Sequence, residues 1–230
     1  MDAHYSTNLQ HAILPLFSAI LFLGVGIIVF FLNKQEYRKP FLRFCYTTFH
    51  WQFSWFLLFY INDARYSDLI AKIGYSGIIF IPVAYYEAVC TYLGIKNKNI
   101  KIFYSLGIVF LAFLWFTNLF ISGSHKYFFG YYPVANYLHV PYLAMVMYLV
   151  VSILLNLLKM RREEKEKVKR VQLLFYFFAV GIYCIAAIDY RSGAKYHFGT
   201  FQAVGIDRNY IMQVSAAVNG IVHSDAIDHY

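Results

Sequence analysis

The side chains best suited to chemistry in this sequence interrupt long apolar stretches. Glu87 lies within "PVAYYEAVCTYL", and His50 lies within "TTFHWQFSW". A carboxylate or an imidazole is costly in hydrocarbon, so such residues face other protein groups and often carry function. For Glu87, three roles stay open: a structural polar contact, ligand binding or signal transmission, and a proton-linked group of a transporter or enzyme. For His50 we expect a hydrogen bond inside the protein, because no second histidine lies at a similar depth to complete a haem site.

A second set of polar and aromatic residues gathers in residues 121–142, "ISGSHKYFFGYYPVANYLHVPY". We expect this stretch to be a loop between two apolar runs. Its tyrosines suit an anchoring collar, because amphipathic aromatic side chains prefer the membrane–water interface. The alternative is ligand binding or signal sensing, for which the candidates are Tyr131, Tyr132, Pro133 and His139, with Asn118 just before the stretch and Glu87 below it.

Common catalytic motifs do not occur in the sequence. It has no glycine-rich phosphate loop, no G-x-S-x-G and no H-E-x-x-H. Four possible metal ligands near the C-terminus have no enclosing shell in the sequence: His223, Asp225, Asp228 and His229. We therefore predict no catalytic residues, no metal and no cofactor.

The apolar composition of the chain indicates the kind of fold that holds these polar residues in place. Of the 230 residues, 60% are hydrophobic, 21% are aromatic and 14% are charged, whereas a soluble domain carries about 25% charged residues. We predict an all-α fold, a multi-pass transmembrane helical bundle that forms a single module over residues 1–230.

The predicted spans are apolar runs of about twenty residues, the length that a helix needs to cross the hydrocarbon core. Six runs qualify: residues 12–32, 41–61, 73–95, 102–121, 140–158 and 171–188. A seventh, residues 199–222, is weaker because Asp207, Arg208 and Asn209 interrupt it. Pro82 is expected to kink the third run and to free a backbone carbonyl that a neighbouring helix can use.

Basic residues are distributed very unevenly between the connections. The connections after the first, third and fifth runs, together with Arg43 just inside the second run, hold 14 of the 20 lysines and arginines. The positive-inside rule makes that side cytoplasmic. The N-terminus is then extracytoplasmic, and the C-terminus is cytoplasmic if the seventh run inserts. Because this pattern accounts for the net charge of +8, we predict the lipid bilayer, and not nucleic acid, as the partner.

Several motifs follow one another in an order that points to a family. They are "IAKIGYSGIIFIPVAYYEAVCTYL", "WFTNLFISGSHKYFFGYYPVANYLHVPYL" and "AAIDY", with "YHFG" later in the chain. They resemble the N-terminal seven-transmembrane module of bacterial sensor histidine kinases, whose fourth helix ends in W-T-x-N before a loop of the form G-Y-Y-P-x-A-G-x-L-H-P. Asn136 stands here where that family often has glycine.

The resemblance implies a signal-input module in a bacterial plasma membrane, part of a two-component system. It also implies a small-molecule or lipid-phase ligand, a cytoplasmic kinase or signalling partner, and a homodimer as the assembly. The phosphoacceptor histidine box and the ATP-lid glycine motifs of the kinase portion do not occur here, so we predict that the chain is not itself an enzyme. The alternatives are a small membrane transporter or intramembrane enzyme that uses Glu87, and a truncated fragment without function.

Overall fold

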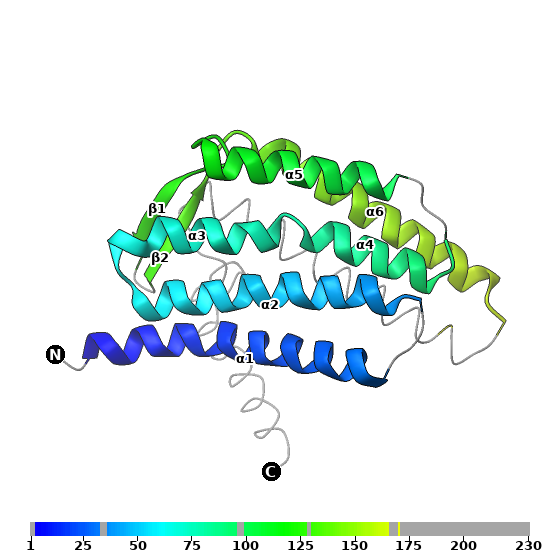
Figure 1. Ribbon diagram of the computed structural model, residues 1–230, viewed down its shortest axis with the longest axis horizontal. Helices are drawn as coiled ribbons and strands as arrows, with labels where there is room; N and C mark the ends of the chain where they lie inside the picture. The colour runs from blue at the N-terminus through cyan, green and yellow to red at the C-terminus, as the bar shows by residue number, and fades with distance from the viewer. Residues whose placement is uncertain (1–2, 33–35, 96–98, 128–129, 166–169, 171–230) are drawn as a thin grey trace, which may run out of the picture. The chain divides into compact units, whose positions relative to one another are not determined.

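The computed structural model describes residues 3–32, 36–95, 99–127, 130–165 and 170 (Figure 1). This part of the chain is mostly helical. Its elements are α1 (Ala3–Leu32), α2 (Arg38–Ile61), α3 (Ala64–Ile78), α4 (Ile81–Tyr92), α5 (Ile100–Phe116), β1 (Ile121–Tyr127), β2 (Gly130–Ala135) and α6 (His139–Glu163).

Three helical stretches are long and apolar enough to cross a membrane: Gln10–Leu32, Ala64–Tyr92 and His139–Glu163. The helix α2 has 24 residues but a lower mean hydropathy, since polar groups such as His50 and Gln52 interrupt its aromatic side chains. The helix α5 is apolar but has only 17 residues. A membrane protein is therefore supported by three candidate spans, where the sequence predicts six. The predicted spans 171–188 and 199–222 lie outside the described residues.

The third predicted span differs from the run read in the sequence. The helix starts at Ala64, well before residue 73, and it is interrupted after Ile78. Pro82 lies in the first turn of α4 and has no N–H, so the carbonyl four residues earlier, that of Ile78, lacks its helical donor. Tyr142 of α6 supplies the missing donor, because its hydroxyl donates a hydrogen bond to the Ile78 carbonyl oxygen at 3.0 Å. The expected kink and the use of the freed carbonyl by a neighbouring helix are both confirmed.

Residues 121–142 are not the loop that we expected. β1 and β2 pair in antiparallel fashion, with Ile121 opposite Ala135 and Lys126 opposite Tyr131. The prediction of an all-α fold is therefore wrong at this point, and the helix predicted to reach residue 121 ends at Phe116. Tyrosine and valine favour strands, and Gly130 permits the positive φ of 131° at the start of β2.

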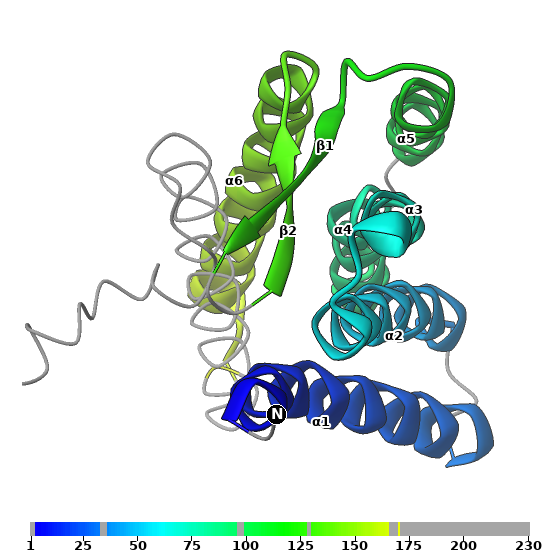
Figure 2. The same ribbon diagram turned by 90° about the vertical axis from the view of Figure 1, so that its left-hand side faces the viewer.

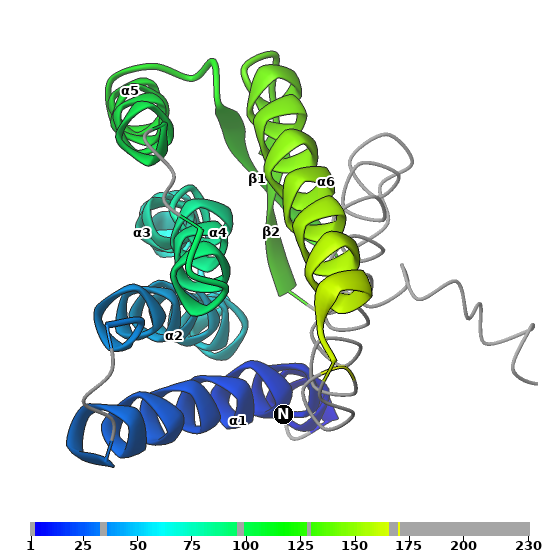
Figure 3. The ribbon, with the colours of Figure 1, turned by 90° about the vertical axis from the view of Figure 1, so that its right-hand side faces the viewer.

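The helices are arranged around α2. It lies between α1 and the pair α3–α4, and α5 lies beyond that pair (Figures 2 and 3). The hairpin packs on α2 and α3, while α6 packs on α4. A glycine allows the close approach of α2 and α3: a Cβ atom added to Gly77 would lie 2.9 Å from the Thr47 carbonyl oxygen. Small residues at helix contacts are typical of membrane bundles.

The helices alternate in direction along the chain, except that α4 continues in the direction of α3, so their termini gather at two ends (Figure 1). We call the end with β1, β2 and the α2–α3 turn the hairpin end. At the other end, α2 starts near the end of α4, where the Tyr37 and Tyr92 rings are 5.6 Å apart. We call this the basic end because it carries Arg38, Lys39, Arg43, Lys101, Lys159, Arg161, Arg162 and Lys165.

Candidate functional site

The hairpin is fixed to the helices by its second strand. Tyr132 is only 7% exposed, and its ring meets the Trp55 ring of α2 edge to face at 5.9 Å. Pro133 is also buried and lies opposite Ser124 in the hairpin. Because successive side chains of a strand alternate between its faces, Tyr131 lies on the other side. It is half-buried, and the Lys126 ammonium lies 5.8 Å from its ring centre.

His139 lies at the first position of α6, beneath the hairpin, and is 4% exposed. Its Nδ1 lies 3.3 Å from the Phe120 carbonyl oxygen, which can only accept, so the tautomer with a proton on Nδ1 donates this bond. Three aromatic rings surround the imidazole, with centroid distances of 5.5 Å to Tyr75, 4.7 Å to Phe120 and 5.7 Å to Tyr142. We call these four residues the His139 cluster.

The His139 cluster joins the hairpin to the break between α3 and α4. Tyr75 contacts Trp55, which in turn contacts Tyr132 of the hairpin. Tyr142 contacts His139 and also donates to the Ile78 carbonyl at the break. A continuous set of packed rings therefore connects an outer strand to the point where the backbone of α3–α4 lacks a helical hydrogen bond.

Asn118 acts through its backbone and not across the helices with its side chain. Its side chain is exposed, and its carbonyl oxygen accepts from Nδ2 of Asn136 at 2.8 Å. The Asn136 backbone N–H also donates to the Phe120 carbonyl at 3.0 Å. Asn136 thus links the segment before β1 to the segment after β2.

Glu87 belongs to a different group of residues at the basic end. Its Oε1 lies 2.7 Å from Nη2 of Arg43 in α2, and its Oε2 accepts from the Tyr104 hydroxyl of α5 at 2.7 Å. The Arg43 guanidinium also lies 5.8 Å from the Tyr104 ring centre. Both carboxylate oxygens of Glu87 are thus bound, and three helices meet at this charge. We call these residues the Glu87 network.

The predicted site residues therefore separate into two groups. Tyr132 and Pro133 lie in the hairpin, and Tyr132 is connected to His139 through Trp55 and Tyr75. Glu87 lies in α4 towards the opposite end. The two residues that pair with Glu87, Arg43 and Tyr104, were not identified from the sequence. Arg43 could have been noticed because it is a charge inside an apolar run. However, no local sequence pattern pairs it with a residue 44 positions away.

His50 makes the expected hydrogen bond inside the protein. Its Nε2 lies 2.8 Å from the Ile73 carbonyl oxygen of α3. Its ring also lies next to Gly77, where an added Cβ would come within 2.8 Å of Cδ2. His50 thus serves the contact between α2 and α3, as a polar side chain between membrane helices commonly does.

Asp63 and Tyr127 lie at the hairpin end, outside the candidate spans, and both have shifted pKa values. Asp63 caps α3 by accepting from the Arg65 backbone N–H at 2.9 Å, and hydrogen bonds from the Arg65 guanidinium hold the pKa of its carboxyl below its usual value. Burial raises the pKa of the Tyr127 hydroxyl. Both shifts widen the pH range over which Asp63 is negative and Tyr127 is neutral.

Among the residues that the structure describes, no three histidine, cysteine, aspartate or glutamate side chains are grouped so that they could hold a metal. The tail with His223, Asp225, Asp228 and His229 lies outside the described residues.

Comparison with protein-family models, with curated proteins and with solved structures finds no match to this chain.

Proposed function

We propose that the chain is a membrane-embedded signal-input module, like the N-terminal region of the sensor histidine kinases that its motifs resemble. It receives a stimulus at the hairpin end and passes it to a cytoplasmic kinase or signalling partner at the basic end. The observation that supports this most is the bond from Tyr142 to Ile78, because the same tyrosine packs against His139. The stimulus acts on the hairpin, and the helix break responds.

A signal requires two arrangements of the protein that bind the stimulus with different affinity. The break between α3 and α4 is the part of the described chain best suited to this. The Ile78 carbonyl has one donor from another helix, so a small movement of α6 can make or release the bond. The N-terminal part of α3 then keeps its contacts with the hairpin while α4 carries Glu87 with it.

The distribution of charge supports an orientation for this module. Eight described lysines and arginines lie at the basic end, which the positive-inside rule assigns to the cytoplasm. The hairpin end, which has Arg65, Lys72 and Lys126 together with Asp63 and Asp68, is then extracytoplasmic in a bacterial plasma membrane. A small-molecule or lipid-phase stimulus can reach it there, and a homodimer can carry the output.

The proposal is tested in a chimera that joins the full chain to the catalytic part of a histidine kinase. Tyr142→Phe keeps the ring in the His139 cluster and removes only the donor to Ile78. We expect it to change the basal phosphorylation output. The control is Tyr148→Phe on the same helix, whose ring stacks on Phe103 and whose side chain is exposed. Equal output from wild type and both variants at equal expression would exclude the proposed role of the break.

A transporter or an intramembrane enzyme that uses Glu87 is the second candidate. Glu87→Gln would abolish flux or turnover in that case, whereas the signal-input module retains an output that is shifted or locked. Both oxygens of Glu87 have fixed protein partners, which is what a structural charge requires, so no observation favours the second candidate.

A further inference from the structure

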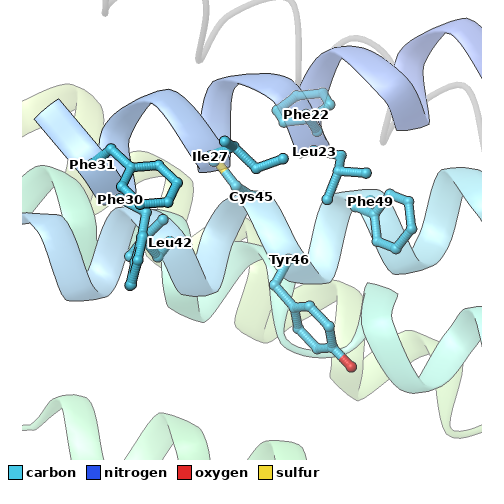
Figure 4. A pocket seen from close by; sticks show the side chains of 10 residues that line it. Phe22, Leu23, Ile27, Phe30, Phe31, Leu42, Cys45, Tyr46 and Phe49 are labelled. Atoms are coloured by element: carbon cyan, nitrogen blue, oxygen red, sulfur yellow. The ribbon is translucent and has the colours of Figure 1, made fainter.

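A groove runs between α1 and α2, and all of its lining residues come from these two helices (Figure 4). It has a volume of about 290 Å³. Its walls are carbon, apart from the Cys45 sulfur and the Tyr46 hydroxyl. The residues that shape it are Phe22, Gly26 and Phe30 from α1 and Leu42, Cys45 and Phe49 from α2.

The groove exists because small residues of the two helices face each other at its middle. A Cβ atom added to Gly26 would lie 3.4 Å from the Cys45 Cβ, which is ordinary contact. Phenylalanines at both ends of the groove form higher walls on each side of this floor. A larger side chain at position 26 would therefore occupy the groove without a severe clash with the backbone.

The dimensions of the groove match one half of a bilayer. Its wall on α1 extends from Phe22 to Phe31, about 14 Å at 1.5 Å per residue. The hydrocarbon core is about 30 Å thick, so one leaflet is about 15 Å deep. A lipid acyl chain that lies along this wall would span its own leaflet.

Positive charge lies at one mouth of the groove. Arg38 precedes Leu42 by four residues and Cys45 by seven, so it shares the face of α2 that forms the wall. Its guanidinium lies 5.7 Å from the ring centre of Phe30. Lys39 is next to it and is exposed. Glu36 is the described carboxylate nearest in sequence to Arg38 and Lys39. The two cations therefore outnumber the one anion at this mouth of the groove.

We propose that this groove binds an anionic phospholipid, with one acyl chain between α1 and α2 and the headgroup phosphate at Arg38 and Lys39. The apolar walls receive the chain, and a guanidinium is suited to bind a phosphate in bidentate fashion. A zwitterionic lipid carries the same phosphate, but its ammonium cancels the net charge. The inference goes beyond the proposed sensory role and does not depend on it.

The test measures lipid retention by native mass spectrometry of the full chain, purified in detergent with equal amounts of dioleoyl phosphatidylglycerol and dioleoyl phosphatidylcholine. We expect phosphatidylglycerol to be retained preferentially. Arg38→Gln with Lys39→Gln should weaken that preference roughly fivefold for each charge removed. Lys101→Gln removes an exposed charge at the same end but on α5, and it should leave the preference unchanged.

A second pair of variants tests the chain-binding part. Gly26→Leu fills the groove and should abolish retention of phosphatidylglycerol. Gly24→Leu, also on α1, meets nothing within 4 Å and should retain it. Because the glutamine variants change only the end of α2, they decide the matter if Gly26→Leu does not fold.

Three results would overturn the proposal. Equal retention of the two lipids shows no selection for an anionic headgroup. Equal preference in wild type and the Arg38→Gln/Lys39→Gln variant shows that these cations do not bind the phosphate. Unchanged retention in a folded Gly26→Leu variant shows that the acyl chain does not lie in this groove.

Discussion

The two ends of the described helices are built from different interactions. At the hairpin end, neutral rings pack around His139, and Tyr75 and Phe120 are almost completely buried. At the basic end, a carboxylate, a guanidinium and a phenol are joined by short polar contacts. Packed rings transmit displacement, since a well-packed cluster does not deform continuously, whereas paired charges hold helices in one register. The hairpin end is thus suited to transmit a displacement, and the basic end is suited to hold α2, α4 and α5 in a defined arrangement.

The largest expected effect on stability is at the hairpin end. Phe120 is fully buried, and Phe120→Ala should lower the free energy of unfolding in detergent by about 3–5 kcal/mol, because it leaves a cavity among the rings. Phe116→Ala is the control, since Phe116 is 88% exposed, and it should change stability by less than about 0.5 kcal/mol. Chemical denaturation gives both values. Equal losses in the two variants would show that the His139 cluster is not a packed core.

At the basic end we expect a coupling between two charges. Arg43→Met and Glu87→Gln should each destabilise the protein, and the double variant should lose less than the sum, with a coupling energy of about 1–3 kcal/mol. Arg43 is half exposed, so the value should be below that of a fully buried pair. A double-mutant cycle of unfolding free energies measures it. Additive losses would mean that the pair contributes nothing.

The contact between α2 and α3 links the two ends and should respond to a single methyl group. Gly77→Ala places a Cβ 2.9 Å from the Thr47 carbonyl oxygen, so we expect a loss of about 1–3 kcal/mol from overpacking. Gly24→Ala, with open space around it, should be neutral or slightly stabilising because alanine favours helix. Thermal unfolding in detergent compares the two. Equal melting temperatures would indicate that α2 and α3 lie further apart.

The smallest effect concerns pH at the hairpin end. The pKa of Asp63 lies below its usual 3.8 because Arg65 stabilises the ionised form. Its contribution to stability is therefore complete above pH 3.8 and is lost as the pH falls through the lowered folded-state value. We expect wild type to lose slightly more thermal stability than Asp63→Asn when the pH drops from 5 to 2.5. Parallel melting curves would show that Arg65 does not stabilise the carboxylate.

The parts of the molecule that the sequence predicted are those set by local composition. Apolar runs located α1 and α6, and Pro82 indicated both the break and the free carbonyl. The donor Tyr142 was not foreseen, because it lies 64 residues from Ile78. The hairpin was read as a loop since its aromatic residues suited an interface equally well. Pairing of Glu87 with Arg43 and Tyr104 also depends on which helices are neighbours, and no local pattern encodes that.

The proposed signal-input function requires that a change at the hairpin end alters the arrangement of the helices at the basic end. It is tested most directly by the distance between spin labels at Lys101 on α5 and Lys159 on α6, both exposed at the basic end. Pulsed electron spin resonance is recorded in bilayers, in a background with the native cysteines replaced. His139→Ala should shift or broaden the distance distribution, while His125→Ala, which changes an exposed residue of β1, should leave it as in wild type. Identical distributions in all three proteins would contradict a connection between the two ends.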